Sequence, residues 1–325
     1  MPKLFPHPAL LAVFAVCGAF TSTPAVASCG SAFCAVNTEW TSETAAGTPG
    51  GSLDLRYEHI DQSQPRAGSR KVGVGEVPNH HDEVNTRNDN VLASYSRAFD
   101  SGWGFSLTAP LVSRRHIHIH NHHGAQLEEQ WKFRELGDLR VTGRYQKAVS
   151  PPDSATPGRA GLIFGLKLPT GRINLANADG DVAERSLQPG TGTTDAIVGA
   201  YFHQQLLQRG ASWFAQSQYQ HALNSKDDFK PGPQFGIDLG YSQSVADKLS
   251  ALIQLNVLVK GRDRGAAAEP ADSGGRSVFL SPGLSYSLSE RTRAYAFFQQ
   301  PLYQYVNGVQ LTARHAIVVG VAARF

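Results

Sequence analysis

The residues best suited to carry chemistry are five histidines in one short segment, residues 114–123, which read RRHIHIHNHH. They are His116, His118, His120, His122 and His123. Alternate residues of a β-strand point to the same face and lie about 6.5–7 Å apart. Neutral imidazole is a good ligand for zinc and copper. If the segment is a strand, the first three histidines share one face and predict a site for a divalent metal ion.

A second histidine-rich stretch could complete the ligand set. It comprises His80, His81 and Asp82, in a segment that we expect at the same end of the molecule. Two other interpretations of these residues stay open. The histidines could form a polar rim without ligand, or a pH-sensitive gate, since histidine changes charge between about pH 5 and 8. Arg114 and Arg115 oppose cation binding. We expect no required cofactor, and zinc or copper as the ion if one binds.

Signals for an enzyme are weak. Polar residues on central segments include Asp195, His203, Ser217, His221 and Asp238, but no arrangement among them stands out. The chain contains no G-x-S-x-G nucleophile motif and no H-E-x-x-H zinc motif. We therefore predict that the protein is not an enzyme.

The N-terminus has the pattern of an export signal. Lys3 is followed by an apolar run from Ala9 to Phe20 and by the small residues Ala25-Val26-Ala27, so residues 1–27 are predicted to be a cleaved signal peptide. Residues 28–50 are then a periplasmic segment that carries Cys29 and Cys34. In an oxidising compartment these two cysteines predict a disulfide. A metal-binding pair, or a lipoprotein with Cys29 lipidated, are the alternatives.

Composition excludes some classes of protein. The formal net charge is +3 and no long run of lysine or arginine occurs, which argues against nucleic acid as a partner. The hydrophobic share of 41% is ordinary, and glycine is frequent at 32 residues. After the signal peptide, no apolar stretch is long enough for a transmembrane helix.

The rest of the chain alternates between apolar and polar residues with the period of a strand. In one segment, Trp103, Phe105 and Leu107 alternate with glycine, serine and threonine. We predict 12 such strands, joined alternately by short and long connections, as in outer-membrane barrels. They cover residues 51–60, 88–98, 102–117, 136–147, 160–169, 193–206, 211–222, 233–243, 247–260, 276–287, 291–300 and 312–325.

The predicted fold is all-β: a transmembrane, antiparallel, up-and-down β-barrel of about 12 strands over residues 51–325. A soluble β-sandwich would show the same alternation. The last strand favours the barrel, because its apolar face ends at Phe325, the terminal aromatic residue that serves bacterial barrels as an assembly signal. Polar side chains on the opposite faces are expected to line a basic lumen. They are Arg56, Arg140, Arg144, Lys167, Gln218, Gln254 and Lys260.

Three short motifs add a family resemblance. They are Gly137-Asp138-Leu139-Arg140, the stretch from Gly165 to Gly171 (GLKLPTG), and the stretch from Leu187 to Gly192 (LQPGTG). In order and spacing the chain resembles the outer-membrane β-barrel family named for the MetA pathway of phenol degradation. The resemblance implies a barrel that passes small molecules. It implies no catalytic residues and no particular solute.

Together these features predict an outer-membrane channel or passive transporter for a small solute, with a histidine-rich extracellular rim that binds divalent metal. One alternative is a metal-binding surface protein that uses the barrel as an anchor, and a third is an outer-membrane hydrolase. Expected partners are outer-membrane lipid, the barrel-assembly machinery and the solute.

Overall fold

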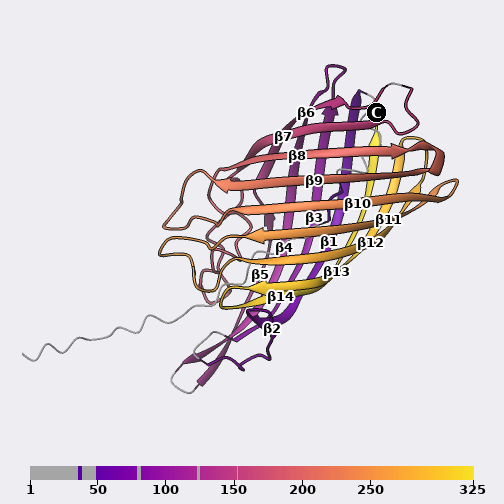
Figure 1. Ribbon diagram of the computed structural model, residues 1–325. Helices are drawn as coiled ribbons and strands as arrows, with labels where there is room; N and C mark the ends of the chain where they lie inside the picture. Colours follow the sequence, from indigo (N-terminus) through magenta and orange to yellow (C-terminus); the bar gives the residue numbers. More distant parts are fainter. Residues whose placement is uncertain (1–35, 39–48, 79–81, 123–124, 152) are drawn as a thin grey trace, which may run out of the picture.

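The computed structural model describes residues 36–38, 49–78, 82–122, 125–151 and 153–325. Antiparallel strands dominate it (Figure 1). They are β1 (Gly50–Ala67), β2 (Arg70–Lys71), β3 (Asp82–Ala98), β4 (Trp103–His122), β5 (Ala125–Leu136), β6 (Leu139–Ala148), β7 (Gly158–Leu168), β8 (Asp195–Leu206), β9 (Ala211–Ala222), β10 (Gln234–Ala246), β11 (Leu249–Lys260), β12 (Gly275–Ser287), β13 (Thr292–Val306) and β14 (Val309–Arg324). Across the described ranges, no helix has the length and apolar character that crossing a membrane requires.

The sheet closes on itself. Each strand of the wall pairs with its neighbour, and β14 pairs with β1 over nearly its whole length, from Ser52 opposite Arg324 to Ala67 opposite Val309. Of the 14 strands in the described residues, β2 is a two-residue extension and β5 pairs with β4 alone, so 12 strands form the wall. The predicted antiparallel barrel and its strand number are confirmed.

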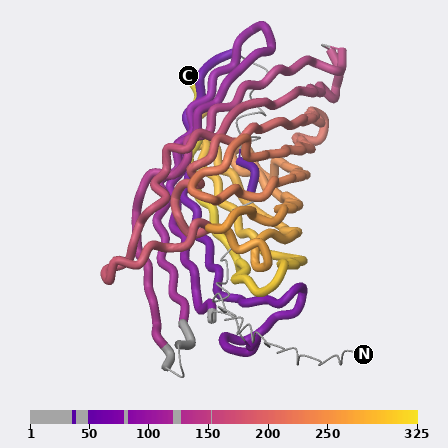
Figure 2. The backbone as a smooth tube through the Cα atoms, turned by 90° about the vertical axis from the view of Figure 1, so that its left-hand side faces the viewer, coloured from indigo at the N-terminus to yellow at the C-terminus, as the bar shows by residue number. Residues whose placement is uncertain are grey.

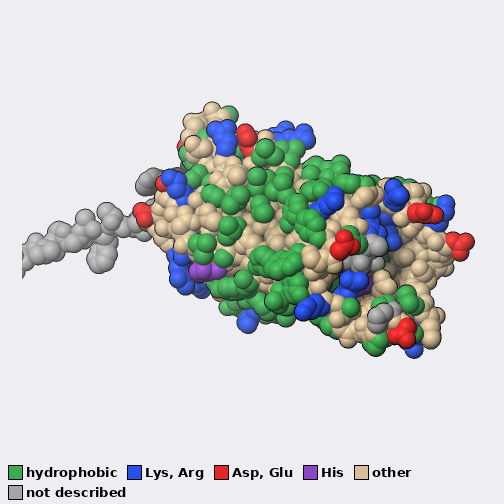
Figure 3. Space-filling view, turned by 90° about the horizontal axis from the view of Figure 1, so that it is seen from above, with side chains coloured by type: hydrophobic (Ala, Val, Ile, Leu, Met, Phe, Trp, Pro, Cys, Tyr) green, Lys and Arg blue, Asp and Glu red, His purple; other side chains and the backbone are tan. Residues whose placement is uncertain are grey.

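The alternation of side chains explains why these segments form a barrel wall. In β1, Leu53 and Leu55 are exposed on the outside, whereas Glu58 faces the interior and is buried. The same pattern repeats around the molecule, and apolar side chains form a broad area over the outside of the wall (Figure 3). Because lipid surrounds such a wall, exposed apolar residues are stable there.

The end of the chain closes the barrel at the side of the short turns, the periplasmic side in outer-membrane barrels. Gly51 and Phe325 exchange two backbone hydrogen bonds, of 2.8 and 3.0 Å. The Phe325 ring lies outside, 65% exposed, and stacks on Tyr95 with the ring centroids 6.4 Å apart. The terminal aromatic residue thus lies at the seam between the first strand and the last.

At the opposite end, three strands extend past the rest of the wall (Figures 1 and 2). The extension, which we call the ribbon, consists of residues 82–88 of β3, 111–122 of β4 and 125–136 of β5. The prediction that 118–135 form a loop is therefore wrong. Beyond the membrane no lipid faces the strands, so the apolar-polar alternation that marks a wall strand is lost. The predicted loop 301–311 is mostly strand as well, since β13 ends at Val306 and β14 begins at Val309.

A long connection between β7 and β8, residues 169–194, covers the extracellular mouth and is called the mouth loop. Its Ala183 and Leu187 are buried with Trp131 of β5 and Leu311 of β14. In the sheet, β7 is separated from β14 by β6, β4, β3 and β1. A loop that reaches Leu311 from β7 must therefore cross part of the mouth.

Candidate functional site

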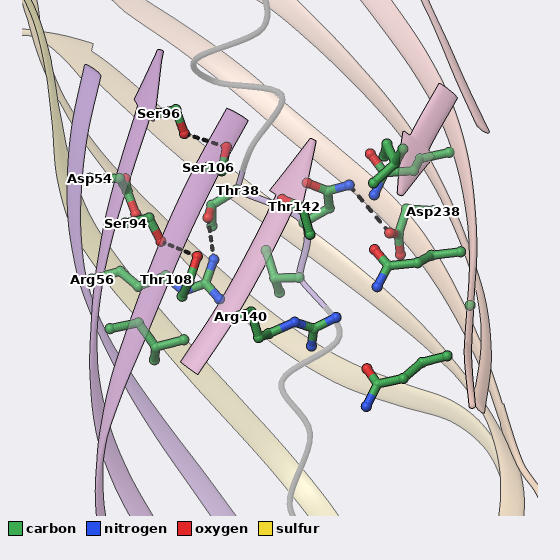
Figure 4. A pocket seen from close by; sticks show the side chains of 18 of the residues that line it. Thr38, Asp54, Arg56, Ser94, Ser96, Ser106, Thr108, Arg140, Thr142 and Asp238 are labelled. Carbon is green, nitrogen blue, oxygen red and sulfur yellow. Dashed lines mark hydrogen bonds between the residues drawn. The ribbon is translucent and has the colours of Figure 1, made fainter. Parts of the chain in front are cut away.

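The lumen contains a cavity of about 250 Å³ that both polar and apolar side chains line (Figure 4). On one wall, serine and threonine hydroxyl groups pair across strands, with Ser94 bonded to Thr108 at 2.9 Å and Ser96 to Ser106 at 2.6 Å. The facing wall carries amide side chains from β9 and β10. They are Gln216, Gln218, Gln220 and Gln234. These groups can exchange hydrogen bonds with a polar solute of either donor or acceptor character.

A piece of the chain's own N-terminal region lies in this cavity. Asn37 exchanges two hydrogen bonds with the Gln254 amide, from its N–H at 3.1 Å and to its C=O at 2.8 Å. Its side chain donates to Asp238 at 3.3 Å, and Arg56 donates to Thr38. Val36 packs in the buried apolar cluster of the inner wall. Residues 36–38 of the segment predicted as periplasmic are thus held inside the lumen, which they narrow.

Charges around the cavity are balanced. Its charged lining residues are Arg56, Arg140, Asp54 and Asp238, so the expected excess of basic residues is not found there. Arg56 is further paired with Glu58 at 2.9 Å.

Of the predicted lumen residues, Arg56, Arg140 and Gln218 line the cavity, and Gln254 reaches it through Asn37. Arg144 lies elsewhere on β6. Lys167 and Lys260 are held in ion pairs, to Asp138 at 2.9 Å and to Asp263 at 3.1 Å respectively.

The three motifs of the family resemblance meet at the mouth. Asp138 accepts hydrogen bonds from the Lys167 ammonium at 2.9 Å, from Gly171 N at 3.0 Å and from Thr191 N at 2.9 Å. Gly171 and Gly190 lie so close that a Cβ on Gly171 would be 2.7 Å from the Gly190 Cα. The motif residues therefore have a structural role, because they anchor both ends of the mouth loop to Asp138, the residue that directly precedes β6.

The second constellation lies in the ribbon, where pairing across three strands sets the side chains in rows. One row holds Glu83, His118 and Glu129, and the next holds Thr86, His116 and Trp131. A bulge in β3 places Glu83 opposite His118, where regular pairing from Thr86 would have placed Val84. Glu83, His116 and His118 are all buried, each at most 2% exposed.

Their polar atoms lie close together. The distance from His116 Nε2 is 3.3 Å to His118 Nδ1 and 3.6 Å to Glu83 Oε2. The other nitrogen of each ring has its own partner: Thr86 Oγ1 lies 2.8 Å from His116 Nδ1, and Glu129 Oε2 lies 3.2 Å from His118 Nε2. Among the residues that the structure describes, Glu83, His116 and His118 form the only group of at least three potential metal ligands whose ligand atoms lie close together.

Burial and neighbouring charges shift the pKa values of groups in and near this cluster. Burial, together with the nearby His118 and Arg114, lowers the pKa of His116 well below its usual value, so its ring is neutral. Glu269, in the connection between β11 and β12, carries a pKa raised to about 9 by burial and then by the carboxylates of Glu83, Asp272 and Asp263. The surroundings are thus rich in carboxylates, which favours a cation over an anion.

The predicted metal ligands are only partly placed by the structure. It brings His116 and His118 together as predicted. Asp82, His120 and His122 are described only as members of their strands, whereas His80, His81, His123, Cys29 and Cys34 lie outside the described residues. Glu83, Thr86 and Glu129 were missed, because nothing in a single sequence gives the register of three strands or the bulge beside Glu83.

The polar residues considered for catalysis are dispersed. Asp195 accepts from Lys167 at 3.2 Å and from Gln220 at 2.6 Å, near the mouth. Asp238 bonds Asn37 and Asn256 within the lumen. His203 and His221 lie at opposite ends of adjacent strands, opposite Phe214 and Ala196 respectively.

A closed antiparallel barrel with a lipid-facing apolar wall and a polar lumen defines an outer-membrane β-barrel protein of bacteria. The model of the family described as "Putative MetA-pathway of phenol degradation" matches residues 93–311. The chain belongs to this family.

One solved structure supports the fold. The COG4313 outer membrane channel from Pseudomonas putida F1 superimposes with a TM-score of 0.64 at 12% sequence identity, over 86% of this chain and 96% of that one. The NanC porin gives a TM-score of 0.45 at 10% identity, over 84% of this chain and 100% of that one. Comparison with curated protein sequences found no match.

Proposed function

We propose that this protein is a passive outer-membrane channel for small, uncharged polar solutes. The observation that carries the proposal is the lumenal cavity, with hydroxyl groups on one wall and amides on the other. Such a lining replaces the hydration of a polar solute without favouring either charge, because two arginines and two aspartates balance around it. The COG4313 protein of like fold is described as a channel, which supports the same reading.

Liposome swelling provides the test. Proteoliposomes should swell in isotonic solutions of small neutral polyols, and more slowly as the polyol becomes larger. A Gln216→Leu/Gln218→Leu variant replaces two lining amides with apolar side chains of similar size, and its permeation rate should fall. Swelling no faster than in protein-free liposomes, together with no conductance in planar bilayers, would refute the channel and leave the anchored surface protein.

We also propose that the histidine-rich extracellular ribbon binds a divalent transition metal, zinc or copper. The observation favouring this second function is the adjacency of His116 and His118, both buried and with nitrogens 3.3 Å apart. Calorimetric titration of the detergent-solubilised protein with zinc and copper should give heats that a His116→Ala/His118→Ala/His120→Ala variant lacks. Equal heats from both proteins would contradict metal binding by these histidines.

A further inference from the structure

We propose that one divalent transition-metal ion binds inside the ribbon, with Glu83 Oε2, His116 Nε2 and His118 Nδ1 as its protein ligands. The inference rests on the metal-binding part of the proposed function and assigns it a specific site. The carboxylate ligand, Glu83, comes from β3, whereas both histidine ligands come from β4. The histidine pattern of residues 114–123 therefore does not contain it. The ion is thus buried between strands, and the histidines nearer the ribbon tip are not needed to hold it.

Distances between the ligand atoms support this assignment. Zinc bonds to nitrogen or carboxylate oxygen are about 2.0–2.2 Å long, so two such ligands of a tetrahedral ion lie about 3.3–3.6 Å apart. The two separations from His116 Nε2 are 3.3 Å to His118 Nδ1 and 3.6 Å to Glu83 Oε2. The three ligand atoms all lie within 4.8 Å of one another. A small adjustment of the Glu83 side chain would complete one triangular face, and a water molecule can take the fourth position.

The second nitrogen of each ring is already held. Thr86 Oγ1 lies 2.8 Å from His116 Nδ1, and the Glu129 carboxylate lies 3.2 Å from His118 Nε2. Metal-binding histidines are usually fixed in this way, by a hydrogen bond from the ring nitrogen that does not face the ion. Each ring is therefore oriented with its remaining nitrogen toward the proposed site.

The charge balance also favours an ion. The Glu83 side chain is only 1% exposed, and a bound cation would offset the cost of burying its carboxylate. The Glu129 carboxylate, 3.2 Å from His118 Nε2, adds negative charge nearby. Arg114, a cation near His116, donates from its guanidinium to Asn88 Oδ1 at 2.6 Å and to Ser186 O of the mouth loop at 3.2 Å.

The experiment compares variants of the full-length protein titrated with zinc, and with cobalt, whose visible absorption reports its ligands. Wild type should bind one ion in the ribbon. Glu83→Gln keeps the size of the side chain but removes the charged ligand, and should weaken binding at least about 100-fold. Glu129→Gln should weaken it about 10- to 100-fold, the usual effect of losing a group that orients a ligand. His59→Ala/His315→Ala, which removes two histidines from the barrel wall, is the matched control and should bind as wild type does.

A His122→Ala/His123→Ala variant separates the buried site from a site at the ribbon tip. Retained binding in this variant, with loss in Glu83→Gln, supports the buried site. Full binding in Glu83→Gln overturns it, while the ribbon histidines can still bind metal elsewhere. If wild type itself binds no ion, both the site and the metal-binding function fail. Heat-modifiable migration of each variant on gels verifies that the barrel has folded.

Discussion

Replacing Gln254 with leucine should release the chain segment that narrows the lumen. Gln254 is 1% exposed and its amide holds both backbone groups of Asn37, at 3.1 and 2.8 Å. Leucine keeps the side chain's approximate volume but makes neither bond. Because Asn37 can hydrogen-bond to water once it leaves, the substitution biases the equilibrium toward the released segment.

The magnitude follows from the bonds that are lost. A typical hydrogen bond contributes about 0.5–1.5 kcal/mol net, so the two together stabilise the bound segment relative to the released one by about 2 kcal/mol. Since about 1.4 kcal/mol corresponds to a factor of ten, the released population should rise about 30-fold. The Asp238 bond and the burial of Val36, worth about 1.5–3 kcal/mol, remain in the variant and keep the segment partly bound.

Single-channel recording in planar bilayers measures this population as the fraction of time spent in the high-conductance state. Gln218→Leu is the matched control, because Gln218 lines the same cavity and no hydrogen bond joins it to residues 36–38 in the described part of the chain. We expect the control to keep the wild-type open fraction. Unchanged recordings from Gln254→Leu, or an equal increase in both variants, would refute the idea that these bonds restrict the pore.

Three further predictions concern the mouth and the seam. Asp138→Ala removes the acceptor of three hydrogen bonds from the mouth loop, donated by Gly171 N, Thr191 N and Thr191 Oγ1, at a cost of about 3 kcal/mol or more, and trypsin should then cleave faster after Arg172 and Arg185; an unchanged cleavage rate would argue against the anchor. Deleting Phe325 removes two backbone bonds at the seam and should lower the yield of folded barrel in outer membranes; a normal yield would contradict its assembly role. Glu269 has a pKa raised to about 9, so the native state binds its proton where the unfolded chain has released it. Native stability near residues 261–274 should therefore fall as the pH rises from about 5 to 9, and proteolysis across this range should show the trend in wild type but not in Glu269→Gln.

Much of the barrel could be predicted because the membrane imposes a simple rule on sequence. Where lipid covers one face, every second residue must be apolar, as Leu53 and Leu55 are in β1. The strand β5 was not predicted, because both faces of the ribbon meet water or polar neighbours. In β5, Glu129 faces His118 while Trp131 packs beneath the mouth loop, so one face carries both charged and aromatic residues. Alternation of hydropathy cannot identify such a strand.

The cluster of Glu83, His116 and His118 was predictable only in its histidines. His116 and His118 share a face by strand periodicity alone, which holds for any strand. Glu83 joins them through pairing between strands and through a bulge that turns it inward in place of Val84. Both depend on tertiary contacts, and the residues next to a bulge point to the faces opposite those that simple counting assigns.

The hydrogen-bonded cluster around Asp138 bears on what the sequence motifs of this family reveal about function. The motifs that relate the chain to its family form the anchor of the mouth loop. Their side chains are engaged in contacts within the protein, as Lys167 is in its ion pairs with Asp138 and Asp195. Shared motifs of this kind report common architecture at the pore entrance and carry no information about cargo. Differences in cargo between relatives should instead be sought at positions equivalent to Arg140 and Gln218, where a change of one side chain alters what the cavity can hydrogen-bond without disturbing the entrance.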